Sequence, residues 1–402
     1  MSRPAELYQW IDTVVMRFPS LSKPQATGLA LWSFGMILAR SCSLSAVADM
    51  LAPLLGQSFN TVRERLRDTY REANAKAGDQ RTELDVTICW GLWLSWILDG
   101  WSGKQLAVGI DATSLGERFV VLTVSILYRG CAVPVAWKVL RAQQKHPWKP
   151  EWLALLQAFK ARVPADWTVI VSADRGLYAK WLFKGIVELG WHPFLRVNVG
   201  GSFRPEGERL WQPFKVLVPA VGARWQGRGT AFSGSKSRLR CTLLGCWSEG
   251  HQDPWLILTD LPPECADACW YGLRTWIERG FKYSKRSGWQ WQHTRMDDPA
   301  RAERLWMAIA LATWWLLSVG GEAEAEEDKL LVIEIPTTPG SARRRGKRWR
   351  LVGIFQHGYA LIITALLKHQ LLAIRPASPE AWPSLSEIGN FSQFAGAVDG
   401  VG

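Results

Sequence analysis

Four residues with chemically useful side chains are spaced at helical intervals between positions 271 and 285. They carry a phenol, a guanidinium, a carboxylate and an ammonium group: Tyr271, Arg274, Glu278 and Lys285. In an α-helix, which turns by about 100° per residue, the four fall within an arc of about 60°. Such a face suits a metal ion held by the carboxylate together with a phosphate held by the bases. A solvated, salt-bridged helix face would show the same pattern.

Two aspartates follow apolar segments further upstream. Asp111 ends the apolar run Leu106–Ile110, and Asp174 comes just after Thr168–Ser172. Open α/β sheets place their sites at strand ends. A lone aspartate there is often only a cap or turn residue. Two such aspartates followed by Glu278 favour one shared acidic site.

The elements that must position these aspartates lie between residues 105 and 198. The pattern predicts three strands, a helix, a strand, a helix and a strand. The strands are Leu106–Ile110, Arg118–Leu127, Cys131–Leu140, Thr168–Ser172 and His192–Val197, and the helices are Trp148–Lys160 and Tyr178–Leu189. This is the element order of an α/β, ribonuclease-H-like fold, in which the first and fourth strands are neighbours. We expect residues 101–198 together with 263–320 to form this catalytic core.

Residues 199–262 interrupt the core and are rich in Gly, Trp, Arg and Ser. Their short alternating runs predict a β-rich insertion with strands at Phe214–Val218, Ser237–Cys246 and Trp255–Thr259. Basic side chains interleaved with tryptophans suit a nucleic-acid surface. A small β subdomain with a tryptophan core is the alternative.

Residues 1–100 read as a helical domain. A helix at Ser43–Leu55 is ended by Gly56, and a second helix runs from about Asn60 to about Ala73. The second helix carries Arg63 and Arg67 on one flank. A helix-turn-helix DNA-binding unit has this form, and so does a surface helix laced with ion pairs.

The C-terminal part, residues 321–402, reads as a basic linker followed by a helical region. After a buried helix at Ala300–Val319, the acidic stretch Gly320–Asp328 predicts a flexible linker. Residues 339–350 form a dense basic run of the kind that contacts nucleic acid or stays solvated. Gly353–Ala373 has a helical, one-sided apolar pattern.

The amino-acid composition indicates which kinds of partner the protein binds. The chain has 402 residues, and its 48 Lys and Arg against 36 Asp and Glu give a net charge of +12. This balance favours a polyanionic partner, nucleic acid first and an acidic membrane second. The seven cysteines are scattered and form no CxxC pair, so reduced thiols are expected rather than a zinc site.

No targeting or membrane segment is evident. The N-terminus lacks the apolar core of a signal peptide. The longest apolar runs, Val86–Leu98 and Leu305–Val319, are shorter than the ~20 residues of a spanning helix. We therefore expect a cytoplasmic protein with no membrane partner.

Together these residues resemble the DDE transposases of bacterial cut-and-paste insertion sequences. The resemblance is carried by Asp111, by Asp174 in Asp-Arg-Gly, and by the spacing of Tyr271, Arg274, Glu278 and Lys285. That last motif is the signature of the branch with a β insertion before the catalytic glutamate. Trp255 ahead of the helix and Lys282 after Phe281 also match. One departure is that Leu177 stands after the Gly, where the family usually has an aromatic residue.

The resemblance implies a DNA transposase that binds the ends of an insertion sequence, cleaves them through a DNA hairpin and joins them to target DNA. It implies that Asp111, Asp174 and Glu278 hold two divalent cations, Mg²⁺ with Mn²⁺ as a substitute. The partner would be double-stranded DNA, both transposon ends and target. The chain would act as a homodimer on DNA, in the bacterial cytoplasm and associated with the nucleoid.

The resemblance also assigns the contacts to DNA. Tyr271, Arg274 and Lys285 would grip the phosphates at the cleaved end, and Trp255 would receive a base turned out of the helix. Lys282, which matches the same motif, would be a further DNA-binding residue. Arg63 and Arg67 lie outside the resemblance and are expected to bind DNA from their place on the second N-terminal helix. Two other readings stay open: a catalytically inactive or regulatory DNA-binding derivative, and a ribonuclease-H-like nuclease that never joins strands. Metal-dependent cleavage separates the first from a transposase, and strand transfer separates the second.

Overall fold

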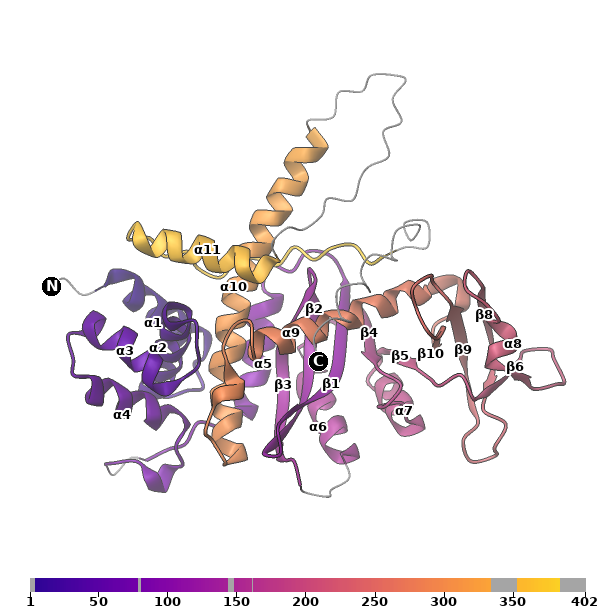
Figure 1. The fold of residues 1–402 in the computed structure, drawn as a ribbon, viewed down its shortest axis with the longest axis horizontal. Coiled ribbons are helices and arrows are strands. Elements are labelled where there is room, and N and C mark those ends of the chain that lie inside the picture. The colour runs from indigo at the N-terminus through magenta and orange to yellow at the C-terminus, as the bar shows by residue number, and fades with distance from the viewer. Residues whose placement is uncertain (1–3, 79–80, 144–147, 161, 334–352, 384–402) are drawn as a thin grey trace.

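A ten-stranded sheet forms the centre and one end of the molecule, and helices cover its faces (Figure 1). The computed structural model describes residues 4–78, 81–143, 148–160, 162–333 and 353–383. The strand order is β3-β2-β1-β4-β5-β10-β9-β8-β6-β7. The protein is therefore a mixed α/β fold.

The first half of the sheet has the order of elements expected from the sequence. It comprises β1 (Gln105–Leu115), β2 (Phe119–Tyr128), β3 (Cys131–Arg141), β4 (Thr168–Ala173) and β5 (His192–Arg196), with helices α6 (Lys149–Lys160) and α7 (Lys180–Glu188) before and after β4. β1, β2 and β3 form an antiparallel meander, whereas β1, β4 and β5 run parallel. The expected pairing of the first and fourth strands is confirmed, since Gly109 stands opposite Ser172.

The expected end of the first strand at Asp111 is wrong. Pairing of β1 with β4 stops at Gly109, but pairing with β2 continues through Asp111 opposite Thr123 to Leu115 opposite Phe119. The antiparallel partner therefore keeps β1 extended beyond the point where the parallel partner ends. Asp111 lies inside a strand, at the edge that β4 leaves open.

The insertion extends the same sheet. It contains β6 (Ser202–Pro205), β7 (Gln212–Pro213), α8 (Phe214–Leu217), β8 (Arg224–Ala231), β9 (Leu239–Cys246) and β10 (Trp255–Thr259). β10 pairs with β5, with Ile257 opposite Arg196. The predicted strand at Phe214–Val218 is wrong, because the chain turns into the short helix α8. The buried ring of Phe214 packs there against Phe232, beside the space that Gly201 leaves.

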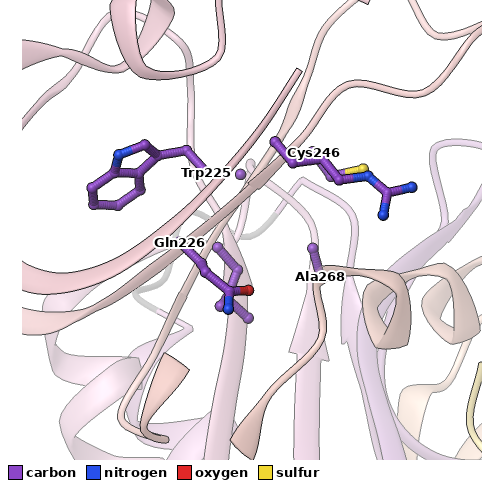
Figure 2. A pocket seen from close by; sticks show the side chains of 7 residues that line it. Trp225, Gln226, Cys246 and Ala268 are labelled. Carbon is purple, nitrogen blue, oxygen red and sulfur yellow. The ribbon is translucent and has the colours of Figure 1, made fainter. Parts of the chain in front are cut away.

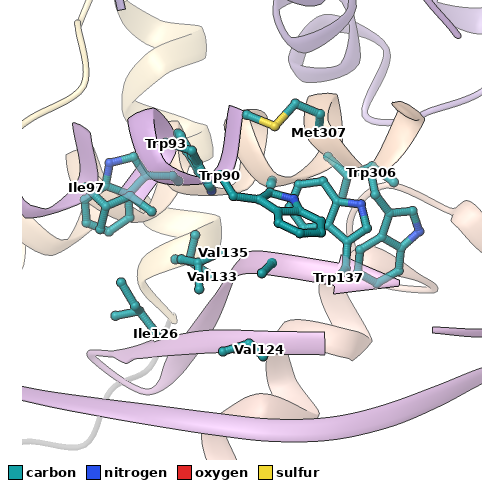
Figure 3. Close-up of a cluster of buried hydrophobic side chains, with 14 of the residues drawn as sticks. Trp90, Trp93, Ile97, Val124, Ile126, Val133, Val135, Trp137, Trp306 and Met307 are labelled. Carbon is teal, nitrogen blue, oxygen red and sulfur yellow. The ribbon is translucent and has the colours of Figure 1, made fainter. Parts of the chain in front are cut away.

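One face of the sheet is covered by α5 (Thr87–Leu98) and by α10 (Pro299–Ile333), as Figure 3 shows. Indole rings from these helices and from β3 fill the layer between them. Trp93 donates from Nε1 to the carbonyl oxygen of Pro134 at 2.9 Å, and Trp137 donates to that of Glu303 at 3.0 Å. Burial of these large rings, with the N–H groups of Trp93 and Trp137 hydrogen-bonded, fixes the helices on the sheet.

The other face carries the segment predicted as one helix over residues 271–285. That expectation is wrong, because a 3₁₀ helix, η3 (Ala268–Thr275), precedes the α-helix α9 (Trp276–Ser284). Lys285 ends α9 with φ −95° and ψ −106°. Gly109 of β1 faces Ile277 of α9, and a Cβ at this position would press on Leu127 at 3.1 Å. Packing against the sheet therefore divides the segment into a 3₁₀ helix and an α-helix in place of the single helix that the sequence spacing predicts.

The N-terminal helices pack against α10. They are α1 (Ala5–Arg17), α2 (Lys23–Ala39), α3 (Leu44–Leu55) and α4 (Phe59–Tyr70), and the short 3₁₀ turns of the chain are η1 (Ala73–Ala75), η2 (Pro263–Cys265) and η4 (Trp291–His293). The expected helix pair around Gly56 is present as α3 and α4. The rings of Trp10 and Trp315 stack at 3.7 Å between centroids. The apolar interior is thus continuous from the N-terminal helices to the sheet.

The predicted flexible linker at Gly320–Asp328 is wrong, because α10 continues through it. Two of its acidic side chains form ion pairs: Glu324 binds Arg129 at 2.9 Å and Glu322 binds Arg375 at 3.2 Å. Gly320 leaves room for the backbone of α11 (Ile354–Leu367). The basic run 339–350 lies outside the described residues.

By length and composition, α10 over Pro299–Glu327 is able to cross a membrane. In the structure, however, 94% of its most apolar window is buried within the protein. A core helix passes the same test of length and composition. The expectation that no membrane is a partner stays a prediction.

Candidate active site

Asp111 lies on β1, and Asp174 directly follows the end of the neighbouring strand β4. Side chains alternate along a strand, so Asp111 shares the face of Gly109, while Asp174 stands two residues after Ser172. Gly109 and Ser172 are paired in parallel register. Two residues further along each chain, the aspartates therefore reach the same level of the sheet.

The three carboxylates converge on a single guanidinium. Arg274, at the end of η3, donates from Nη2 to Oδ2 of Asp111 at 2.6 Å and from Nη1 to Oε1 of Glu278 at 2.8 Å. The same Nη2 lies 3.9 Å from Oδ2 of Asp174. Glu278 stands in the first turn of α9, four residues after Arg274. The structure thus brings together Asp111, Asp174, Glu278 and Arg274.

Backbone amides hold the other oxygen of each aspartate. Oδ1 of Asp111 accepts from the N–H of Ala112 at 2.8 Å. Oδ1 of Asp174 accepts from Gly176 and Leu177, both at 3.0 Å, in a turn that follows β4. Each aspartate therefore presents its Oδ2 to the space between the strands. An aromatic residue directly after Gly176 is not needed for this turn, which uses only backbone N–H groups.

Burial and charge shift the pKa values at the centre of the site. Burial raises the pKa of Asp111, and the guanidinium of Arg274 opposes that rise only in part. Burial also lowers the pKa of Arg274, but Asp111, Tyr271 and the other carboxylates outweigh it, so the net change is upward. The side chain of Arg274 is only 13% exposed. Arg274 is thus a fixed positive charge in a partly desolvated acidic site.

Lys285 extends the site along β1. Its Nζ donates to Oγ1 of Thr113 and to the carbonyl oxygen of Ser114, both at 2.7 Å. Burial lowers the pKa of this ammonium group. Thr113 shares the sheet face of Asp111, because the two residues are two apart on one strand. That spacing is a signal from which Thr113 could have been found as the partner of Lys285. Lys282 is exposed on α9, one turn after Glu278.

Tyr271 and Trp255 form a buried aromatic contact beside the acidic site. Their ring centroids are 5.3 Å apart in an edge-to-face arrangement, and His251 lies 5.1 Å from Trp255 on another side. Tyr271 is 3% exposed, and burial raises its pKa to about 12. In this arrangement the phenol packs on Trp255 and is not open to solvent.

A cavity of about 250 Å³ lies in the insertion, beside Trp225 and Cys246 (Figure 2). Its walls come from β8, β9 and the start of η3, with Gln226, Cys246 and Ala268 among them. Cys246 is paired with Trp255 across β9 and β10. Cys246 is buried, and a hydrogen bond from Cys269 lowers the pKa of its thiol.

Arg63 and Arg67 do not join this site. They lie on α4, at the opposite end of the molecule from the insertion (Figure 1). Both guanidinium groups pair with Oε1 of Glu64: Nη1 of Arg63 lies 3.6 Å from it, and Nη1 of Arg67 lies 2.7 Å from it. A residue that sequence reasoning missed is Asp253, which binds Arg175 at 3.1 Å next to Asp174. No periodicity or motif in the sequence connects that pair.

The donor set fits a hard divalent cation. Carboxylate oxygens are the ligands that Mg²⁺ and Mn²⁺ prefer. As the side chains stand, however, no group of three Asp, Glu, His or Cys residues in the described part of the chain is gathered closely enough to hold an ion. The carboxylates surround Arg274 rather than one another. A cation would occupy the space that the guanidinium now fills.

Comparison with known proteins bears on the same segment. The family model for the transposase DDE domain matches residues 112–315, just over half of the chain. No curated protein matches the chain. A solved structure described as a piggyBac transposase synaptic complex with hairpin DNA aligns over 85% of this chain and 84% of that chain, with 12% sequence identity and a TM-score of 0.31. That score is too low to show a shared fold, whereas the family model begins one residue after Asp111 and includes Asp174, Arg274 and Glu278. The chain belongs to the family of DDE-domain transposases.

Proposed function

We propose that this protein is a DNA transposase of a bacterial cut-and-paste insertion sequence, with Asp111, Asp174 and Glu278 as its catalytic residues. The observation that carries the proposal is their convergence on Arg274 from three separate segments. A DNA-binding protein without activity has no need to gather three carboxylates where phosphates would approach. The membership in the DDE family supports the same conclusion.

The three carboxylates would hold two divalent cations, Mg²⁺ or Mn²⁺. When bound, such a pair activates an attacking hydroxyl and stabilises the leaving oxygen in an in-line displacement at phosphorus. The chain's own residues do the positioning. Asp111 and Asp174 are oriented by the backbone amides that bind their Oδ1 atoms. Glu278 is fixed by α9, which rests on the sheet.

The surrounding residues would bind DNA. Lys285 would hold the phosphate at the cleaved end, since its Nζ lies at the same strand as Asp111. Arg274 and Tyr271 would join it, and Trp255 would take a base turned out of the duplex, consistent with excision through a DNA hairpin. Lys282 would add a contact from the exposed side of α9, and Arg63 with Arg67 would grip phosphate from the N-terminal helices.

The fold and assembly follow from this function. We propose that β3-β2-β1-β4-β5 with their helices form a ribonuclease-H-like core, residues 101–198 plus 263–320. Residues 199–262 are its insertion, 1–100 its helical DNA-binding part and 321–402 its C-terminal region. Cut-and-paste requires two ends to be brought together, so the protein would act as a homodimer on double-stranded DNA in the bacterial cytoplasm.

The test uses a plasmid that carries the reading frame's own flanking DNA. With Mg²⁺, the full chain should excise the flanked segment and join it to a second plasmid, and chelation should stop both reactions. Asp111→Asn and Glu278→Gln should abolish cleavage while binding of the flanking DNA in Ca²⁺ survives. The matched control is Asp166→Asn. The carboxylate of Asp166 is exposed and pairs with Lys104, away from the site.

The possible outcomes separate the candidate functions. Cleavage that persists in both Asp111→Asn and Glu278→Gln would disprove the assignment. Cleavage without joining would indicate a nuclease. Binding without metal-dependent cleavage by the unaltered chain would indicate a regulatory derivative.

A further inference from the structure

The guanidinium of Arg274 occupies the place that a metal ion would need. Its Nη2 lies between Oδ2 of Asp111 at 2.6 Å and Oδ2 of Asp174 at 3.9 Å, while Nη1 binds Glu278 at 2.8 Å. We propose that, without DNA, Arg274 closes the acidic site to metal ions, and that a DNA phosphate opens it by taking over the guanidinium. The inference rests on the proposed function, because it assumes that the three carboxylates are the metal ligands.

Arg274 and a metal ion compete for the same carboxylate oxygen atoms. Asp111 has its Oδ1 engaged with Ala112 and its Oδ2 engaged with Arg274, so no oxygen of this carboxylate is free of a donor. Mg²⁺ requires ligand oxygens at about 2.1 Å in near-octahedral geometry. Asp111 and Asp174 would hold an ion through the Oδ2 atoms that now face Nη2 of Arg274. The ion and the guanidinium therefore exclude each other.

The positive charge of Arg274 stabilises the acidic site. Three carboxylates that face one another repel, and a nearby cation relieves that repulsion. Arg274 is 13% exposed, so its attraction to them is weakly screened. Before metal arrives, the guanidinium keeps the site assembled. The same stabilisation must be given up when a metal ion binds, which lowers the apparent metal affinity of the DNA-free protein.

A phosphate is the ligand best suited to release Arg274. The guanidinium is a planar fork of N–H donors that matches phosphate oxygens as well as carboxylates. Its Nε is buried and has no hydrogen-bond partner among the described residues, so the present arrangement does not use all of its donors. Moving onto a phosphodiester keeps the charge paired and vacates the carboxylate oxygens.

The backbone at Arg274 suits such a movement. Arg274 lies in the last turn of η3, one residue before its end at Thr275, where the 3₁₀ helix gives way to α9. Junctions of this kind often act as hinges, because 3₁₀ hydrogen bonds have poorer geometry than those of an α-helix. Glu278 stands beyond the junction, in the α-helix itself. The guanidinium can therefore leave while Glu278 remains in place.

The two binding events are then coupled. DNA that draws Arg274 away raises metal affinity, and metal that displaces Arg274 raises DNA affinity by the same factor. The protein would take up its catalytic ions only where a phosphodiester is present.

The first experiment measures Mn²⁺ binding to the full chain without DNA, by electron paramagnetic resonance of the free ion. Arg274→Gln should bind Mn²⁺ about tenfold or more tightly than the unaltered chain, within the usual range of coupling energies. The matched control is Arg175→Gln, which removes a positive charge next to Asp174 that is paired with Asp253, and leaves Arg274 in place. Equal tightening in both variants would mean a general charge effect and would overturn the inference, as would no tightening in Arg274→Gln.

The second experiment needs no variant at the arginine, so it holds even if Arg274→Gln fails to fold. The unaltered chain is titrated with Mn²⁺ with and without a duplex fragment of the flanking DNA. The inference requires affinity about tenfold or more higher with DNA; equal affinity would overturn it. Asp111→Asn distinguishes the two levels of the argument. If it binds Mn²⁺ as well as the unaltered chain does with DNA, the proposed metal site itself is wrong. If it binds Mn²⁺ less tightly, the proposed metal site is retained whatever Arg274 does.

Discussion

Gly280 of α9 lies against Ala132 of β3 so closely that a Cβ on the glycine would stand 3.0 Å from both the Cβ and the carbonyl oxygen of Ala132. This contact sets the height of α9 above the sheet, and with it the position of Glu278 two residues earlier. The active site is therefore sensitive to the size of a residue that bears no functional group.

Replacing Gly280 by leucine should lift α9 from the sheet. Overpacking of this kind is expected to lower the free energy of unfolding by about 1–3 kcal/mol, and to abolish cleavage because Glu278 moves away from Asp111. Urea unfolding and plasmid excision measure the two effects. Gly200→Ala is the control, since a Cβ there meets nothing within 4 Å. Full cleavage by Gly280→Leu would show that α9 does not set the site.

Lys285→Ala should impair resolution of the DNA hairpin more than first-strand nicking. The ammonium group is held by Thr113 and Ser114 at the far side of Asp111, where the cleaved end would lie. Loss of a charged hydrogen bond to phosphate, worth about 1.5–3 kcal/mol, corresponds to a slowing of about tenfold to a hundredfold. Denaturing gels that separate nicked, hairpin and opened ends provide the measurement. An equal slowing of both steps would contradict this role.

Trp255→Ala should weaken extrusion of a base near the transposon end. Base–aromatic stacking contributes about 1–3 kcal/mol per base, and Trp255→Phe should retain part of it. Fluorescence of 2-aminopurine placed at successive positions of the flanking DNA reports an unstacked base. Trp211→Ala is a control, because Trp211 lies elsewhere in the insertion between Arg204 and Arg238. An unchanged fluorescence pattern in Trp255→Ala would exclude the role.

Glu72→Gln should destabilise the protein in a pH-dependent way. Hydrogen bonds from Arg301 lower the pKa of Glu72 from 4.5 to about 2. A depressed carboxyl pKa stabilises the fold above the ordinary pKa, and this contribution is lost as pH falls toward the folded value. We expect a loss of about 1 kcal/mol at pH 7, shrinking below pH 4.5. Urea unfolding followed by tryptophan fluorescence at several pH values measures it, with exposed Glu117→Gln as control. A constant difference at every pH would contradict the linkage.

The order of elements around the site could be read from the sequence, because buried strands and amphipathic helices leave clear apolar periods. The same periods placed Asp111 and Asp174 on neighbouring strands. They could not show that β1 runs on to Leu115, since that depends on pairing with β2 rather than on local sequence. Nor could they show that the guanidinium of Arg274 lies among the carboxylates.

The acidic stretch after Gly320 shows why local sequence patterns alone could not predict this part of the fold. Two glycines followed by glutamates are typical of a linker, yet here the glycines permit close approach of α11 and of Tyr128. Glu324 binds Arg129, a residue almost two hundred positions earlier in the chain. Contacts at such separations override helix propensity, and one sequence alone does not contain them.

The pairing of β10 with β5 determines which strand edge the sheet exposes. Without β10, the hydrogen-bonding groups along β5 would form an open border, and borders of that kind recruit strands from other molecules. The added strands move that border outward to β7, which is only two residues long and ends in Pro213. A deletion variant that closes the chain directly from β5 to η3 would therefore precipitate before it could be tested for chemistry.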